Sequence, residues 1–488
     1  MAFDRIKLLW TRNFISTWIL FFVIALAPLP FGSTDRTVIA FWCVLLSVAV
    51  ILLSTKGLVR GELWVIAGLL VIVAGYGFVL HEQLAERPWV APFHPVWKRA
   101  SEVLGEPLVP SASIVRNGPF FAIGATLANM LSLLLGLVIG TDRVRGRQIM
   151  LVIATSGAIY ALYGVLSFLI EPGMLLWRDK KFYTSSVTGT FVNRNSAAAY
   201  FGSCAILWLL LLLHKVRRRM PRRIVWRRVI RDLPRFSKRE ILPPCSALLI
   251  CMMALMMTVS RAGVALSLLA MIIAFTIFLK KDLPSRTGIW ISVGAGAALA
   301  LVLLQLFGGR VSSRFDSQGL DDEGRIEGWK STLQIIADNP WFGTGLGSFP
   351  QAFPPYRSPL ISISGIWERA HSTPLELAAD VGLPLACLVA AGWGTMQVIL
   401  LLGCVGRRRS SMVVPLAALA ISTLALLHSS IDFTLQIPGY SIPFFGLFGA
   451  GVAQALRSGA VNREVAGPDG LQRWSRRLAS QNPGEPDT

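Results

Sequence analysis

The chain has 488 residues, of which 53% are hydrophobic and only 15% are charged. Soluble proteins carry about 25% charged residues, so this composition excludes a soluble class and indicates a membrane protein. The net charge of +20 lies mainly in segments that flank apolar runs, where it sets topology and attracts anionic lipid headgroups. No nucleic-acid-binding function is predicted from it.

Twelve apolar runs follow one another along the chain. A helix rises about 1.5 Å per residue and needs roughly 20 residues to cross the hydrocarbon core, so each run can form one span. We therefore predict an all-α polytopic membrane protein with about twelve transmembrane helices. The predicted spans are residues 14–31, 37–54, 63–80, 119–140, 148–170, 195–213, 242–259, 262–280, 287–307, 374–403, 413–430 and 438–456.

Little of the chain lies outside these spans. Residues 1–456 are predicted to form one transmembrane domain, and residues 457–488 a disordered polar tail. The six cysteines lie in or beside apolar runs, and the sequence predicts no disulfide, metal site or cofactor. The longer connections are the loops 81–118, 171–194, 214–241 and 308–373.

Lysine and arginine residues predict the orientation, because short loops that carry them stay in the cytoplasm. With the N-terminus inside, the inner segments hold 31 of the 47 Lys and Arg residues, and segment 214–241 alone holds 12. Both termini are therefore predicted to be cytoplasmic. The opposite face then carries loops 81–118 and 171–194 and the large loop 308–373, which precedes the tenth span.

The first polar cluster lies directly before the sixth span and comprises Asn193, Arg194, Asn195 and Ser196. Asn195 or Ser196 can cap the following helix, whose N-terminus carries free N–H groups and a partial positive charge. With Arg194 beside it, this helix end is a candidate anion site. An arginine that snorkels from a capped helix end explains the same residues equally well.

A second cluster, Ser260 and Arg261, lies between the seventh and eighth spans, which almost nothing else separates. A tight helical hairpin would hold Arg261 at the membrane boundary, where its guanidinium can donate two hydrogen bonds to a phosphate group. Interfacial anchoring of the arginine is an equal alternative.

The largest predicted outer loop contains an amphipathic helix. Ile326, Trp329, Leu333 and Ile336 recur at helical spacing, and Arg325 lies one turn before Trp329. We expect this helix to lie against the bundle or the lipid surface.

Two other features of the same loop are explained more simply by structure than by ligand binding. The adjacent Asp321 and Asp322 fit a solvated acidic loop better than a divalent cation site. Gly343, Gly345 and Gly347 have the spacing of a phosphate-binding loop, but they follow a helical pattern and face a compartment without nucleotides. A structural turn is therefore predicted there.

A third candidate group surrounds His371, at the mouth of the predicted bundle. Thr373 and Glu376 have the spacing of a capping box and Pro374 suits the first helical position, so the tenth span is predicted to begin there. A histidine titrates near neutral pH and can act as general base for a hydroxyl within about 3 Å. A solvated loop histidine is the alternative explanation.

His428 and Asp432 lie between the last two spans and place another histidine and a carboxylate on the same predicted face. Packing between helix ends explains these two residues about as well as a functional role does.

Together these residues resemble the O-antigen ligase and polymerase family of bacterial inner-membrane glycan transferases. The resemblance covers roughly residues 120 to 455, and the combination of motifs is specific although each motif alone is weak. The matching segments are Gly189 to Asn195, Ser260 to Gly263, Arg325 with Trp329, Asn339 to Gly347, and Ala370 to Ser372 leading into Leu375 and Glu376.

The resemblance implies a GT-C type glycosyltransferase of lipopolysaccharide or surface polysaccharide biosynthesis. Its donor would be an undecaprenyl-diphosphate-linked glycan, and its acceptor a glycan or lipid A-core hydroxyl on the periplasmic side of the inner membrane. Arg194 and Arg261 would bind the diphosphate, and His371 would deprotonate the acceptor. Displacement would invert the anomeric carbon without a metal or other cofactor. Supporting residues would be Asn193, Asn195, Arg325, Glu376, His428 and Asp432.

Two alternatives stay open. A polymerase of the same family, acting on O-antigen or exopolysaccharide, shares the fold and most of the motif pattern. A transporter or flippase for the same lipid-linked glycan belongs to another class. Transporters place ionisable groups near the membrane midplane in repeated halves, whereas the groups named above lie at span ends, which favours a transferase.

Overall fold

A computed structural model describes residues 13–219, 238–280, 323–362, 365–405 and 412–466, together with 290, 293, 294 and 296–298. Within these residues the fold is helical, apart from a short hairpin of β1 (Met174–Leu175) and β2 (Arg178–Asp179). The α-helices are α2 (Phe14–Leu26), α3 (Arg36–Ile51), α4 (Arg60–Leu84), α5 (Val96–Leu104), α6 (Gly118–Ile139), α7 (Arg143–Ile170), α8 (Arg194–Arg219), α10 (Lys238–Met257), α11 (Arg261–Leu279), α14 (Glu323–Asp338), α15 (Phe349–Ala352), α16 (Thr373–Val381), α17 (Leu383–Val405), α18 (Val413–Ser429) and α19 (Pro438–Ala466). Two 3-10 turns are η2 (Pro354–Tyr356) and η4 (Thr434–Gln436).

Seven helices in the described part of the chain are long and apolar enough to cross a membrane, namely α4, α6, α7, α8, α10, α11 and α17. Three shorter apolar helices, α2, α3 and α18, accompany them. The chain is therefore a multi-pass membrane protein, as its composition predicts. Every predicted span except 287–307 coincides with helix, and that range lies almost wholly outside the described residues.

The tenth predicted span, residues 374–403, is two helices rather than one. Helix α16 ends at Val381 and α17 begins at Leu383, with Gly382 between them at φ 84°. A Cβ at Gly382 would overlap the backbone of Trp341, so the close approach of that loop requires glycine there. Only α17 belongs to the spanning set, and α16 precedes it.

Helix α8 occupies the interior of the bundle, whereas α4 and α17 lie at its periphery. In the apolar window of α8, 83% of the residues are buried, against 11% in the windows of α4 and α17. Helix α8 packs on α7, α10, α11 and α18, and α19 packs most extensively on α6. A Cβ at Gly136 would overlap the backbone of Gly446, so α6 and α19 approach as closely as small residues allow.

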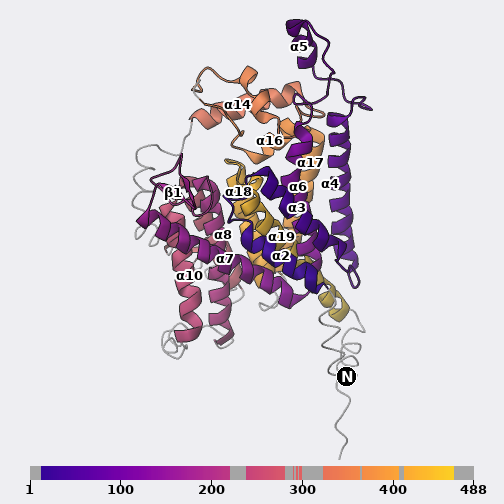
Figure 1. Cartoon of the computed structure of the whole chain (residues 1–488). Coiled ribbons are helices and arrows are strands. Elements are labelled where there is room, and N and C mark those ends of the chain that lie inside the picture. The colour runs from indigo at the N-terminus through magenta and orange to yellow at the C-terminus, as the bar shows by residue number, and fades with distance from the viewer. Residues whose placement is uncertain are drawn as a thin grey trace, which may run out of the picture.

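At one end of the bundle, the segments that connect the helices form a cap. Figure 1 shows α5, α14 and α16 at this end, which we call the capped end. Backbone hydrogen bonds join segments of the cap to one another, and one of them runs from Ile114 N–H to the Thr344 oxygen (2.9 Å). Beside the cap, Val187 N–H donates to the Met257 oxygen (2.9 Å). The glycine turn predicted at Gly343 to Gly347 lies in the cap, and its three glycines all have positive φ.

Gln83, near the end of α4, joins three segments of the cap. Its amide nitrogen donates to the carbonyl oxygens of Phe342 (2.7 Å) and Asp380 (2.9 Å). Its amide oxygen accepts from Leu346 N–H (3.0 Å), and its backbone oxygen accepts from Ser111 Oγ (3.1 Å). Gln83 is fully buried, and the Phe342 oxygen and Leu346 N–H depend on its side chain for their hydrogen bonds, whereas the Asp380 oxygen also accepts from Gly345 N–H.

Replacing Gln83 with alanine should therefore destabilise the cap. The change removes the partner of the Phe342 oxygen and of Leu346 N–H, while the Asp380 oxygen keeps its bond from Gly345 N–H, which predicts a loss of about 2–4 kcal/mol in unfolding free energy. Thermal unfolding of the detergent-purified protein measures it. Gln334, exposed on α14, is the matched control, because Gln334→Ala removes the same atoms from a solvated site. Equal unfolding temperatures for the two variants would contradict the role assigned to Gln83.

Helix α14 forms where the amphipathic pattern predicts it, but the predicted buried face is only partly right. Ile336 is buried, whereas Ile326 and Leu333 are exposed. The buried line is instead Gly328, Ser331, Thr332 and Ile335, because the ring of Trp367 packs directly on Gly328. Small and hydroxyl residues on this line were not recognisable as core from their apolar content.

Candidate active site

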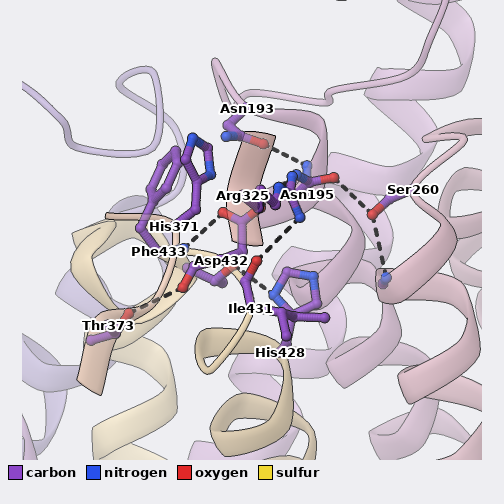
Figure 2. A network of polar contacts seen from close by, with 12 residues as sticks. Asn193, Asn195, Ser260, Arg325, His371, Thr373, His428, Ile431, Asp432 and Phe433 are labelled. Atoms are coloured by element: carbon purple, nitrogen blue, oxygen red, sulfur yellow. Dashed lines mark hydrogen bonds and ion pairs between the residues drawn. The ribbon is translucent and has the colours of Figure 1, made fainter. Parts of the chain in front are cut away.

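Beneath the cap, the ends of four helices meet around the buried carboxylate of Asp432 (Figure 2). Asp432 follows α18 and is 1% exposed. Its Oδ2 accepts from Asn195 Nδ2 of α8 (2.6 Å) and from Arg325 Nη2 of α14 (3.4 Å). Its Oδ1 accepts from Phe433 N–H (2.7 Å), and its backbone oxygen accepts from Thr373 Oγ1 of α16 (3.3 Å). The structure thus brings three motifs of the sequence to one carboxylate.

Helix α8 begins at Arg194, and its cap is Asn193 rather than the predicted Asn195 or Ser196. Asn193 Oδ1 accepts from Asn195 N–H (2.7 Å), the bond that an N-cap side chain makes. The Asn195 side chain is not available for capping because it lies against Asp432 and Ser260. The Arg194 guanidinium lies over the Tyr183 ring, 5.0 Å from its centroid.

The predicted hairpin between the seventh and eighth spans is present between α10 and α11. Ser260 caps α11, with its Oγ accepting from Gly263 N–H (3.3 Å), and Arg261 is the first helical residue. The tight reversal places Val259 at φ 54°. Ser260 Oγ also donates to Asn195 Oδ1 (2.8 Å), so the N-termini of α8 and α11 are joined directly.

His371 lies on the short segment that leads into α16 and is half-buried. Its backbone has φ 51°, and its carbonyl oxygen accepts from Trp329 Nε1 of α14 (3.1 Å). The imidazole makes edge contacts with Trp367 and Phe433, at centroid distances of 5.6 and 5.2 Å. A left-handed backbone at a histidine is uncommon and is maintained only when surrounding contacts fix it.

The predicted capping box at Thr373 and Glu376 does not form. The N-cap of α16 is Ser372, and Thr373 Oγ1 donates to Asp432 instead. The buried Glu376 carboxylate accepts from Ala370 N–H (2.7 Å) and pairs with Arg369 (3.1 Å). Glu376 therefore holds the residues just before His371 in place, instead of capping α16 as predicted.

His428, at the end of α18, is buried beside this group. Its Nδ1 lies 2.9 Å from Thr434 Oγ1, so it joins α18 to η4 and shapes the turn that carries Asp432. Of the residues predicted from the sequence, Asp321 and Asp322 lie outside the described part of the chain.

Comparison with protein families gives a match that includes part of this region. Residues 246–390 match the O-antigen ligase family. This segment of the chain is therefore similar to O-antigen ligases. The match contains Arg261, Arg325, His371 and Glu376 and confirms the resemblance expected from the sequence. No curated protein matches the chain.

The matched segment does not contain all of these residues. Arg194 and Asn195 precede it, and His428 and Asp432 follow it, yet hydrogen bonds join Asn195 and Asp432 to Ser260 and Arg325 within it. The matched family implies a glycosyl-transferring ligase activity in general terms.

Two buried carboxylates, Glu376 and Asp380, share one face of α16, and only Glu376 was predicted from the sequence. Asp380 lies one turn further on, and its Oδ2 accepts from Gly347 N–H (2.8 Å). Burial and the neighbouring Glu376 carboxylate raise the pKa of Asp380 well above its usual value. An aspartate inside an apolar run was the signal that could have identified it.

Asp380→Asn should therefore make the protein more stable at alkaline pH. Because the folded-state pKa is raised, folding binds a proton, and stability declines as pH rises from the unfolded value of 3.8 through the folded value. Asparagine keeps an oxygen for Gly347 and removes this decline, which is worth about 1.4 kcal/mol per unit of raised pKa.

Thermal unfolding measured from pH 5 to pH 9 tests this prediction. The variant should gain on the wild-type protein as pH rises, whereas Asp338→Asn, at an exposed position on α14, should follow the wild-type curve. A constant difference at every pH would show that Asp380 is not the titrating group.

Proposed function

We propose that this chain transfers a glycan from a polyprenyl diphosphate to an acceptor hydroxyl at the periplasmic face of the inner membrane. The observation that carries the proposal is the junction of α8 and α11, two helices that each begin with an arginine and are joined through Asn195 and Ser260. Helix N-termini bind phosphate groups through free N–H groups and a positive dipole, and arginine adds paired donors.

The chemistry follows from the charges that change during transfer. As the glycosidic bond to the carrier breaks, negative charge develops on the departing diphosphate, and fixed guanidinium groups stabilise it. In the proposal Arg194 and Arg261 bind the diphosphate and supply this charge. Undecaprenyl diphosphate leaves, and the anomeric carbon is inverted by direct displacement.

The acceptor hydroxyl must lose a proton as it attacks, and we assign this step to His371. Its position between α14 and α16 is held by Trp329 and by the Glu376 contacts that precede it. A side chain in a fixed position is what general base catalysis requires. The proposal therefore needs the chain's own side chains for both charge stabilisation and proton transfer, and assigns no role to a metal.

The periplasmic location rests on the distribution of Lys and Arg together with the cap. Segment 214–241, with 12 Lys and Arg residues, favours the cytoplasm for the end of α8 that lies away from the cap. The site at the start of α8 then faces the periplasm. This is the side on which a lipid-linked glycan that has been moved across the membrane is presented.

Carrier-linked products in a deletion strain test the function and separate ligase from polymerase. The ligase proposal predicts that long chains accumulate on the lipid carrier, and that the plasmid-borne wild-type gene restores their attachment to the acceptor. Single repeat units on the carrier would identify a polymerase instead. Transport of lipid-linked glycan by the purified protein, in vesicles that lack acceptor, would favour a flippase and contradict both.

A further inference from the structure

An unbroken set of hydrogen bonds runs across the site from one arginine-bearing helix to the next. It passes from Ser260 Oγ to Asn195 Oδ1 (2.8 Å), from Asn195 Nδ2 to Asp432 Oδ2 (2.6 Å), and from Arg325 Nη2 to the same oxygen (3.4 Å). Figure 2 shows the four side chains in this order. We call this set the positioning chain.

The positioning chain begins and ends on fixed backbone. Ser260 Oγ accepts from Gly263 N–H in the first turn of α11 (3.3 Å), and Arg325 Nη1 donates to the Ile431 oxygen (3.1 Å). Asn195 uses both ends of its amide, since its oxygen accepts from Ser260 and its nitrogen donates to Asp432. Its orientation is therefore determined, and an apolar or shorter side chain would leave a gap.

Asp432 is the residue where the positioning chain meets the histidine. Its side chain is buried and accepts from α8, from α14 and from Phe433 N–H, while the Phe433 ring contacts the His371 ring. A buried carboxylate with charged and neutral donors is held in one geometry, because every lost donor leaves charge without solvation.

We propose that Asn195 and Asp432 are positioning residues. They hold the arginines at the starts of α8 and α11, and Arg325 of α14, in the relative positions needed to bind one diphosphate together. This inference rests on the proposed function, which it deepens by assigning residues that act through the arginines. Neighbouring helix ends without the connection would move independently, and a diphosphate needs all its donors within about 3 Å at once.

Binding of undecaprenyl diphosphate to the full-length protein in lipid nanodiscs tests the inference. Asn195→Ala and Asp432→Asn should each weaken binding roughly tenfold to a hundredfold, the range for one hydrogen bond to a charged group. The double variant should bind undecaprenyl diphosphate no more than about threefold less tightly than the single variant with the lower affinity. Either change alone already interrupts the positioning chain.

Exchanging the amide and the carboxylate between positions 195 and 432 distinguishes a positioning role from a general loss of structure. Asn195→Asp alone should bind at least as poorly as Asn195→Ala, because it places two carboxylates in contact. Combined with Asp432→Asn it restores an amide and a carboxylate in reversed order, and at least half of the loss on a logarithmic scale should be recovered. Asp338→Asn is the control for the Asp432 change.

Three results would overturn the inference, namely unchanged binding in the single variants, multiplicative losses in the double variant, or no recovery in the reversed pair. A glycan-transfer assay on the same preparations separates this from the function itself. Wild-type protein that binds undecaprenyl diphosphate but transfers nothing would overturn the proposed function. The effect of the Asn195 and Asp432 variants on binding could still be measured. Wild-type protein that does not bind the probe would overturn both.

Discussion

Replacing His371 with alanine should reduce glycan transfer by roughly a hundredfold to ten-thousandfold, the contribution of a positioned general base. Binding of undecaprenyl diphosphate should change little, because His371 is assigned to the acceptor and not to the donor. Purified protein, a lipid-linked donor glycan and a lipid A-core acceptor provide the measurement, with product detected by its shift on a gel.

His371→Asn is the companion variant, because asparagine tolerates the left-handed backbone at this position and removes only the imidazole. The two variants should therefore lose transfer to a similar extent, with Asn the more stable of the two. His94→Ala, at a half-buried histidine just before α5, is the control and should transfer normally. Transfer at the wild-type rate by His371→Asn would remove the histidine from the mechanism.

The second large effect is expected when the arginines at the helix starts lose their charge. Arg194→Gln and Arg261→Gln should each lower transfer by about a hundredfold to a thousandfold, the cost of removing one group that stabilises charge in a transition state. Lysine at either position should recover part of the loss, because it restores the charge but not the paired donors.

Arg116→Gln provides the comparison, since Arg116 pairs with Glu86 on the exposed surface of the cap and should be dispensable. Binding of undecaprenyl diphosphate, measured separately from transfer, provides a second test of the arginine assignment. The arginine variants should bind undecaprenyl diphosphate weakly, in contrast to the His371 variants. Normal donor binding by both Arg194→Gln and Arg261→Gln would show that the diphosphate is held elsewhere.

The helices were predictable from the sequence because each apolar run carries its own signal. A span needs only its own residues to be recognised, so the run at 262–280 coincides with α11 to within one residue at each end, and the run at 195–213 lies within α8, which continues to Arg219. The break at Gly382 was less evident, since it depends on the Trp341 backbone packing against it as well as on the glycine.

The details of the site were harder to predict because distant residues decide them. Asn195 and Ser196 were the predicted caps of α8, but Asn195 contacts Asp432, 237 residues later, and Asn193 is the cap. Thr373 and Glu376 have the right spacing for a capping box, but Asp432 and Ala370 take their side chains. Local spacing therefore identified residues that the fold brings together around Asp432, but it left their hydrogen bonds undetermined.

Two helices that begin on an arginine work against their own dipoles, since a cation is unfavourable beside the positive end of a helix. Arg194 and Arg261 make both α8 and α11 such helices, and the positioning chain brings their starts together. Two guanidinium groups and two positive helix ends therefore lie in one region, an arrangement that favours the binding of an anion. Under the proposed function, release of the product diphosphate would return the site to this arrangement, which would favour binding of the diphosphate of the next carrier molecule irrespective of its sugar.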